Sequence, residues 1–154
     1  MPASDSATLP TGFELDRKRH ALRFERQLGA TPETAFRAWT EPAQVACWWD
    51  ATGERLAECA IDLRVGGAFR FTNAQHRDRP FIGTYVEIAP PERLVFEAMG
   101  ATGTVTLTPA GNGTHMIVEI RCASAEHLEQ FVAMGVAAGT SQTLDNLAAL
   151  LAGE

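Results

Sequence analysis

Aromatic side chains are the residues of this sequence whose types and spacing best indicate a function. Trp39, Trp48 and Trp49 stand close together in the first third of the chain. An indole ring offers a large apolar surface and one N–H donor, so the three rings could form a lid over the mouth of an internal cavity. Rings of this kind are usually buried, so they could equally pack short helices onto a sheet.

A second apolar set is spread over the rest of the chain. Its members would come from several expected strands and the last helix, as the lining of a pocket would; in the same fold they could simply form the core. Tyr85 is the strongest candidate for a ligand contact, because its hydroxyl needs a partner if it is buried. The predicted ligand-binding residues are therefore Trp39, Trp48, Trp49, Phe69, Phe71, Tyr85, Phe96, Phe131 and Met134.

Ionisable candidates for catalysis are few. A carboxylate or imidazole that faces a cavity could act as acid or base. Glu97, Glu119 and His115 alternate with apolar neighbours, however, and are predicted to face water. Arg26 interrupts an apolar face and could pair with a buried acid or with the anionic end of a ligand. No catalytic residue is predicted from these patterns.

Metal and cofactor motifs do not occur in the sequence. The 4 histidines show no i, i+4 ligand spacing, and the 3 cysteines form no C-x-x-C pair. No G-x-S-x-G, G-x-G-x-x-G or Walker-type loop is found either. We therefore expect no metal and no cofactor.

Charge and composition narrow the class of partner. The chain has 154 residues, with 13 Lys and Arg against 19 Asp and Glu, which gives a net charge of −6. A nucleic-acid binder normally shows a basic footprint, and an anionic membrane surface would repel this chain. The longest apolar run, residues 131–139, is shorter than the about 20 residues that a membrane span needs. Residues 1–10 do not resemble a secretory signal, and the unpaired cysteines suit a cytoplasmic protein.

The elements that must position the aromatic residues follow from periodicity and from turn and cap residues. We expect a flexible leader over 1–18 and one domain over 19–152. Thr31 and Pro32 mark the start of a helix, a second short helix ends at Trp48 and Trp49, and Ser124 begins a long apolar stripe that Gly135 and Gly139 interrupt. Alternating or turn-bounded segments predict strands at 20–28, 55–63, 68–72, 82–88, 94–97, 102–108 and 114–122.

The order of these elements predicts an α+β fold. The strands are short and have no helices between them, so they should form one antiparallel sheet of about six to seven strands. A sheet with one wet face must cover the other, and the long C-terminal helix is the available cover. A curved sheet wrapped on that helix would leave a wedge between the two layers.

Several motifs resemble those of bacterial START-like (SRPBCC) proteins, most closely the group similar to the C-terminal domain of the activator of a heat-shock-protein ATPase. The likeness covers about residues 22–151. The motifs are ATPETAFRAWT at 30–40, WW at 48–49, DLRVGGAFRF at 62–71, GTYVEIAPPERLVF at 83–96 and LDNL at 144–147. Many members of the group carry Gly-Trp in the last helix, where this sequence has Gly135-Val136.

The resemblance implies a helix-grip (START-like/Bet v-like) fold with a hydrophobic cavity between sheet and helix. The leading functional hypothesis is therefore that the protein binds an apolar or aromatic small molecule there. One alternative is an enzyme of the polyketide cyclase or dehydratase type that uses Tyr85, Glu87 or His115 for proton transfer. Another, by family analogy alone, is a chaperone-interacting module. We expect no nucleic-acid partner and no membrane insertion, and leave a homodimer open.

Overall fold

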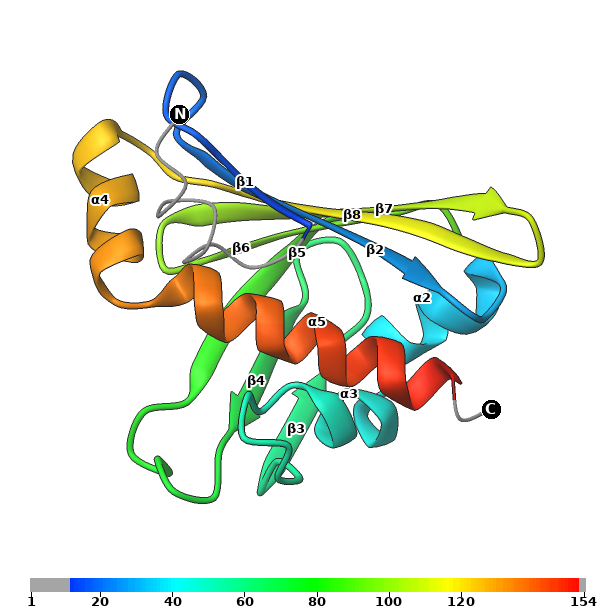
Figure 1. The fold of residues 1–154 in the computed structure, drawn as a ribbon. Helices are drawn as coiled ribbons and strands as arrows, with labels where there is room; N and C mark the ends of the chain where they lie inside the picture. Colours follow the sequence, from blue (N-terminus) through cyan, green and yellow to red (C-terminus); the bar gives the residue numbers. More distant parts are fainter. Residues whose placement is uncertain (1–11, 153–154) are drawn as a thin grey trace.

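One curved antiparallel sheet and a long helix beneath it dominate the computed structural model, which describes residues 12–152 (Figure 1). The strand order is β1-β2-β8-β7-β6-β5-β4-β3. The elements are β1 (Phe13–Asp16), β2 (Ala21–Leu28), α2 (Pro32–Thr40), α3 (Pro42–Trp48), β3 (Glu58–Ile61), β4 (Ala68–Thr72), β5 (Phe81–Ala89), β6 (Arg93–Ala98), β7 (Ala101–Ala110), β8 (Gly113–Arg121), α4 (Ala125–Ala133) and α5 (Val136–Ala152).

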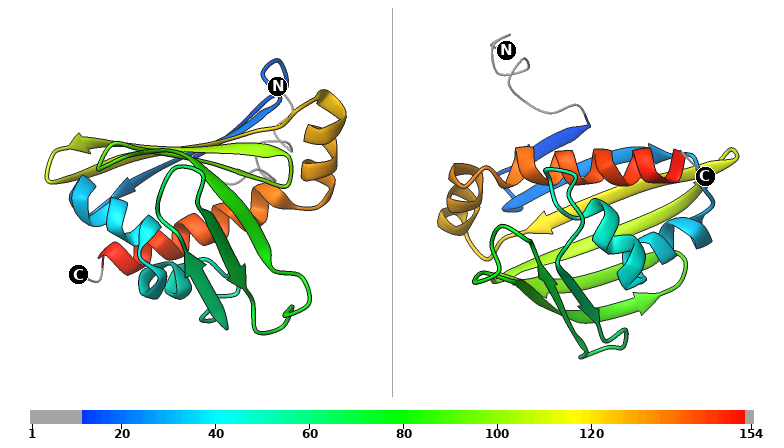
Figure 2. Two further views of the ribbon diagram at one scale, coloured as in Figure 1. Left: turned by 180° about the vertical axis from the view of Figure 1, so that it is seen from behind. Right: turned by 90° about the horizontal axis from the view of Figure 1, so that it is seen from below.

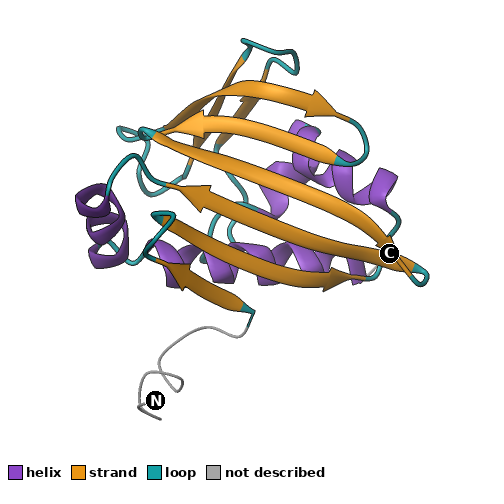
Figure 3. Ribbon diagram, turned by 90° about the horizontal axis from the view of Figure 1, so that it is seen from above, coloured by secondary structure: helices purple, strands orange, loops and turns teal. Residues whose placement is uncertain are grey.

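Helices α2 to α5 of the described residues lie on one side of the sheet or at its edge, and its other face is left uncovered (Figure 3). Alternation along the strands explains this asymmetry. In β2, β7 and β8 the residues Phe24, Val105 and Val118 occupy one cross-strand row and are buried. Their neighbours along each strand point to the uncovered face. The predicted α+β helix-grip architecture is confirmed.

The sheet has eight strands, one more than the six to seven predicted. The extra strand is β1, so residues 13–16 of the expected leader over 1–18 form part of the sheet. Phe13 packs its ring 5.2 Å from that of Phe24, and the strand pairs antiparallel with β2. Four residues are too few to show a clear alternation, which is why the pattern does not reveal this strand. Residues 1–11 of the leader lie outside the described residues.

The long C-terminal stripe is two helices rather than one. Helix α4 ends at Ala133, and Gly135 follows with a φ of 79°, the left-handed conformation that ends many helices. Helix α5 then crosses beneath the sheet (Figure 2). Gly139, the second expected interruption, lies inside α5 without breaking it.

Arg26 fixes α5 to the sheet. Its guanidinium donates to Asp145 Oδ1 at 2.9 Å and to Ser141 Oγ at 2.6 Å. The Arg26 side chain is 11% exposed and that of Asp145 is 58% exposed. Arg26 therefore pairs with an acid, but this acid lies at the surface and not in the interior as expected. Among residues 12–152, no helix has both the length and the apolar character that crossing a membrane requires.

Candidate functional site

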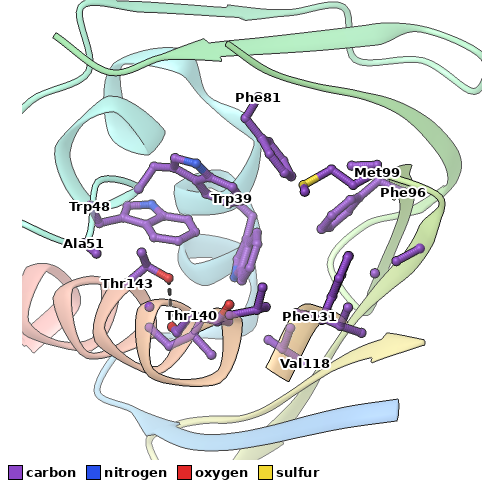
Figure 4. A pocket seen from close by; sticks show the side chains of 18 residues that line it. Trp39, Trp48, Ala51, Phe81, Phe96, Met99, Val118, Phe131, Thr140 and Thr143 are labelled. Atoms are coloured by element: carbon purple, nitrogen blue, oxygen red, sulfur yellow. Dashed lines mark hydrogen bonds between the residues drawn. The ribbon is translucent and has the colours of Figure 1, made fainter. Parts of the chain in front are cut away.

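A cavity of about 290 Å³ lies between α5 and the inner face of the sheet (Figure 4). Its walls come from α2, α3, β5 to β8, α4 and α5, so distant parts of the sequence meet there. The lining residues are Trp39, Trp48, Trp49, Ala51, Phe81, Phe96, Ala98, Met99, Ala101, Gly103, Val118, Ile120, Phe131, Val136, Gly139, Thr140, Thr143 and Leu144.

The three tryptophans form one wall of the cavity. Trp39 and Trp48 meet edge to face with ring centroids 4.8 Å apart, and Trp49 lies 5.6 Å beyond Trp48. The Trp48 Nε1–H donates to the Ala38 carbonyl at 2.9 Å, and the Trp39 Nε1–H points at the sulfur of Met116 at 3.4 Å. These two indoles therefore have partners within the protein and present their apolar surfaces to the cavity.

The nine predicted binding residues divide into three groups. Trp39, Trp48, Trp49, Phe96 and Phe131 line the cavity. Phe69, Phe71 and Tyr85 instead stand behind this wall, around a neighbouring hollow of only about 10 Å³. Met134 lines neither space and is 61% exposed, because the helix ends one residue before it.

Phe69 is the centre of the aromatic cluster behind the wall. Its ring lies 4.9 Å from that of Phe71, 5.2 Å from Tyr85 and 5.6 Å from Phe96. Burial raises the pKa of the Tyr85 phenol above its usual value. This cluster supports the cavity wall from behind.

Sequence reasoning missed most of the lining residues, and five of them show the reasons. Phe81 precedes its expected strand by one residue, and Met99 belongs to the turn between β6 and β7. Gly139, Thr140 and Thr143 interrupt the apolar stripe of the last helix. The sequence does contain a signal for Gly139, Thr140 and Thr143. These small or polar residues lie with helical spacing on a helix face that is otherwise apolar.

Val136, which follows Gly135 where the resemblance implies a tryptophan, lines the cavity. It stands at the first residue of α5, close in sequence to the left-handed Gly135. A valine side chain fills less space than an indole. The smaller residue therefore leaves room at this end of the cavity.

The candidates for proton transfer do not meet in the cavity. Glu87 is exposed and accepts from Arg93 at 3.1 Å, and His115 lies on the uncovered face, where its Nε2 is 2.7 Å from Glu25 Oε2. Hydrogen bonding to His115 and the charge of Arg23 lower the pKa of the Glu25 carboxyl. None of the described lining residues is ionisable, and within residues 12–152 no three His, Cys, Asp or Glu side chains are grouped to hold a metal.

The three thiols are free and differ in exposure, which gives a test of the packing. Burial raises the pKa of Cys59 to about 11, and it also raises that of the buried Cys122. Since the thiolate is the nucleophile, we expect iodoacetamide at pH 8 to label the exposed Cys47 first and Cys122 only on unfolding. Peptide mass spectrometry over time would measure this order. Equal labelling rates for all three would contradict the packing.

Solved structures similar to this chain are bacterial proteins of the same fold. One, a crystal structure from Rhodobacter sphaeroides, shares 29% identity with a TM-score of 0.77 and covers 86% of this chain and 92% of that chain. A protein from Arthrobacter aurescens, solved by NMR, shares 19% identity with a TM-score of 0.79 over 94% and 92% of the two chains. The AHSA1-like protein from Aeromonas hydrophila shares 23% identity with a TM-score of 0.68 over 82% and 88%.

No curated protein matches this chain. The family model described as activator of Hsp90 ATPase homolog 1-like protein matches residues 29–152, which include both Trp-bearing helices, α5 and every lining residue. The resemblance inferred from the motifs is therefore confirmed. The chain belongs to the activator of Hsp90 ATPase homolog 1-like family of the START-like (SRPBCC) superfamily.

Proposed function

We propose that this protein is a cytoplasmic binding protein for an apolar or aromatic small molecule, which it holds between the sheet and α5. The observation that carries the proposal is the cavity of about 290 Å³ whose described walls have no ionisable side chain. Its volume is close to the lower end of the range of about 300–1,000 Å³ in which ligand pockets fall. The three free cysteines agree with a reducing compartment.

The free energy of binding would come mainly from removing apolar surface from water, at about 25 cal/mol per Å². A carboxylate or ammonium group placed in the cavity would lose its hydration and find no opposite charge on the walls. The net charge of −6 adds no long-range attraction for an anion. Shape and apolar contact therefore select the ligand.

The enzyme alternative has less support, because its candidate residues for proton transfer do not line the cavity. Tyr85 lies behind the cavity wall, while Glu87 and His115 are on or near the surface with ion-pair partners of their own. A general acid or base must reach the substrate within hydrogen-bond distance or through one water. These three residues do not converge on one point where a substrate could sit.

The chaperone contact stays a prediction that rests on the family name, and the homodimer stays open. The surface does carry exposed apolar side chains near β3 to β5, namely Leu63, Val65, Ile82 and Val86. Co-purification with an Hsp90-type chaperone, lost on changing Ile82 and Val86 to serine, would support that contact. If the same serine variant still binds decanol in the titration described next, ligand binding in the cavity is independent of the chaperone contact.

Intrinsic tryptophan fluorescence tests the binding proposal, because all 3 tryptophans of the chain line the cavity. 1-Decanol neither absorbs nor emits in the tryptophan range, so a saturable change in emission during its titration reports binding directly. Val136→Phe should weaken the apparent affinity for decanol about tenfold by filling part of the cavity. Val132→Phe is the matched control, since Val132 is 37% exposed on α4 and does not line the cavity.

A saturable change in the wild type that Val136→Phe weakens and Val132→Phe leaves intact would support binding in the cavity. No saturable change with decanol or with any member of a panel of apolar alcohols and aromatic compounds would contradict it. Equal weakening by both variants would place the alcohol outside the cavity.

A further inference from the structure

The face that α5 turns toward the cavity has a gap in its middle. Its lining residues are Val136, Gly139, Thr140, Thr143 and Leu144, the i, i+3, i+4, i+7, i+8 spacing of one helical face. Four of these positions carry a side chain into the cavity wall, and the fifth, Gly139, carries none.

Gly139 has no packing or backbone reason to be glycine. Its φ is not in the left-handed region, and a Cβ added there would meet no atom within 4 Å. Gly103, on the opposite wall, differs, because a Cβ there would lie 2.6 Å from the Phe96 ring. A glycine inside a helix makes the helix less stable than alanine would. The effect of Gly139 on this structure is to lower helix stability and to leave open space in the cavity.

Beside Gly139, two hydroxyl groups provide the polar atoms of the cavity. Thr140 and Thr143 carry the only side-chain oxygens among the described lining residues. The Thr143 hydroxyl donates to the Thr140 carbonyl at 2.8 Å, so its oxygen is left to accept a hydrogen bond (Figure 4). A ligand lying over Gly139 would therefore present a hydrogen-bond donor to this part of the helix.

The volume sets the size of the ligand. An apolar cavity of about 150 Å³ is large enough to bind benzene. A cavity of about 290 Å³ is about twice that size, so it would take about two aromatic rings. The aromatic walls formed by the three tryptophans, Phe96 and Phe131 suit flat rings, which pack edge to face or offset against them.

We propose that the cavity selects an uncharged, two-ring aromatic alcohol whose rings lie over Gly139 and whose hydroxyl donates to Thr143. This inference rests on the proposed function and adds the ligand class and the two residues that determine it. Gly139 is a specificity-determining position, because its missing side chain makes the space that one ring occupies. Thr143 distinguishes the alcohol from the hydrocarbon.

Calorimetric titration with 2-naphthol, naphthalene and 2-naphthoate near pH 7 tests the ligand class. The three compounds share one ring system. 2-Naphthol carries a neutral hydrogen-bond donor, naphthalene carries no polar group, and 2-naphthoate carries a negative charge. We expect 2-naphthol to bind at least tenfold more tightly than 2-naphthoate and about two- to tenfold more tightly than naphthalene, the range that one hydrogen bond contributes. Thr143→Val should reduce the preference for 2-naphthol over naphthalene to about one.

Substitutions at Gly139 test the position of the rings. Gly139→Leu should weaken both naphthalene and 2-naphthol at least tenfold, whereas Ala138→Leu, which adds the same side chain to an exposed neighbour on α5, should change neither. Gly139→Ala removes less space and guards against misfolding of the leucine variant. It should weaken binding by a smaller factor while raising the Tm by about 1–4 °C.

Equal or tighter binding of 2-naphthoate, or wild-type affinity in Gly139→Leu, would overturn the inference. If neither naphthalene nor 2-naphthol binds while decanol still gives its saturable change, the ligand class is wrong and the binding proposal stands. If decanol fails as well, both are wrong. Three results together support the proposal. The wild type binds 2-naphthol more tightly than naphthalene and 2-naphthoate, Thr143→Val abolishes the preference over naphthalene, and Gly139→Leu weakens the binding of both neutral compounds.

Discussion

Trp48→Ala should lower the free energy of unfolding by about 3–5 kcal/mol, the range observed when large aromatic side chains are removed from a core. Trp48 is 1% exposed and contacts the rings of both Trp39 and Trp49. Its removal would also leave the Ala38 carbonyl without the indole donor that now lies at 2.9 Å. Urea denaturation followed by far-UV circular dichroism measures the loss.

Cys47→Ala is the matched control for this substitution, because Cys47 precedes Trp48 in α3 and is exposed. We expect its effect to stay within about 0.5 kcal/mol, as is usual at surface positions. A loss below about 1 kcal/mol in Trp48→Ala would show that α3 is not packed onto α2 in the way the structure has it.

Gly83→Ala should destabilise the fold by about 1–3 kcal/mol, because a methyl group at this position has no room. Its Cβ would overlap the Phe69 ring and would lie 2.7 Å from the Glu97 carbonyl oxygen. The backbone oxygen cannot move without disturbing the β5–β6 pairing. Because Phe69 supports the cavity wall, the substitution should also weaken decanol binding. Thermal and urea unfolding measure the first effect, and tryptophan emission the second.

A second glycine provides the comparison for Gly83. Gly139→Ala adds the same methyl group where no atom lies within 4 Å, so the two substitutions should change stability in opposite directions. Combining Gly83→Ala with Phe69→Leu should restore part of the loss, since a leucine can move away from the new methyl group where a ring cannot. Additive losses in the double variant would contradict a direct contact.

Local signals in the sequence predicted most of the fold. Thr31 caps α2, with its side chain accepting from the Thr34 N–H, and Pro32 stands at the first turn as expected. Ser124 likewise caps α4 by accepting from the His127 N–H. Each of these caps depends on residues three or four positions apart, so the local sequence alone is enough to predict it. Strand β1 was missed because four residues paired with a neighbour carry little periodic signal.

The cavity is harder to predict from the sequence than the fold, because its shape depends on how side chains from distant segments pack against one another. Trp39, Trp48 and Trp49 were recognised from their type and grouping, and all three line the space. The prediction for Met134 depends on one continuous last helix, whereas α4 ends at Ala133 and the left-handed Gly135 follows Met134. Phe69, which the sequence predicts to line the cavity, belongs to the layer behind its wall.

Open space is harder to infer than packed side chains. Gly139 was noted as a break in the helical pattern, and a glycine in a helix can indicate close packing, a kink or a functional gap. Only the positions of the surrounding atoms distinguish these alternatives, and here no atom lies within 4 Å of the Cβ site. The sequence indicates an unusual residue, and the structure shows open space beside it.

The space between the sheet and α5 should hold a neutral apolar ligand. Intermolecular nuclear Overhauser effects in the protein bound to 2-naphthol test it most directly, because they locate the ligand on named methyl groups. Bound 2-naphthol should give contacts to the methyls of Val136, Thr140 and Thr143, which line the cavity. Contacts confined to exposed methyls such as those of Ile82 and Val86, or no contacts under saturating ligand, would contradict it.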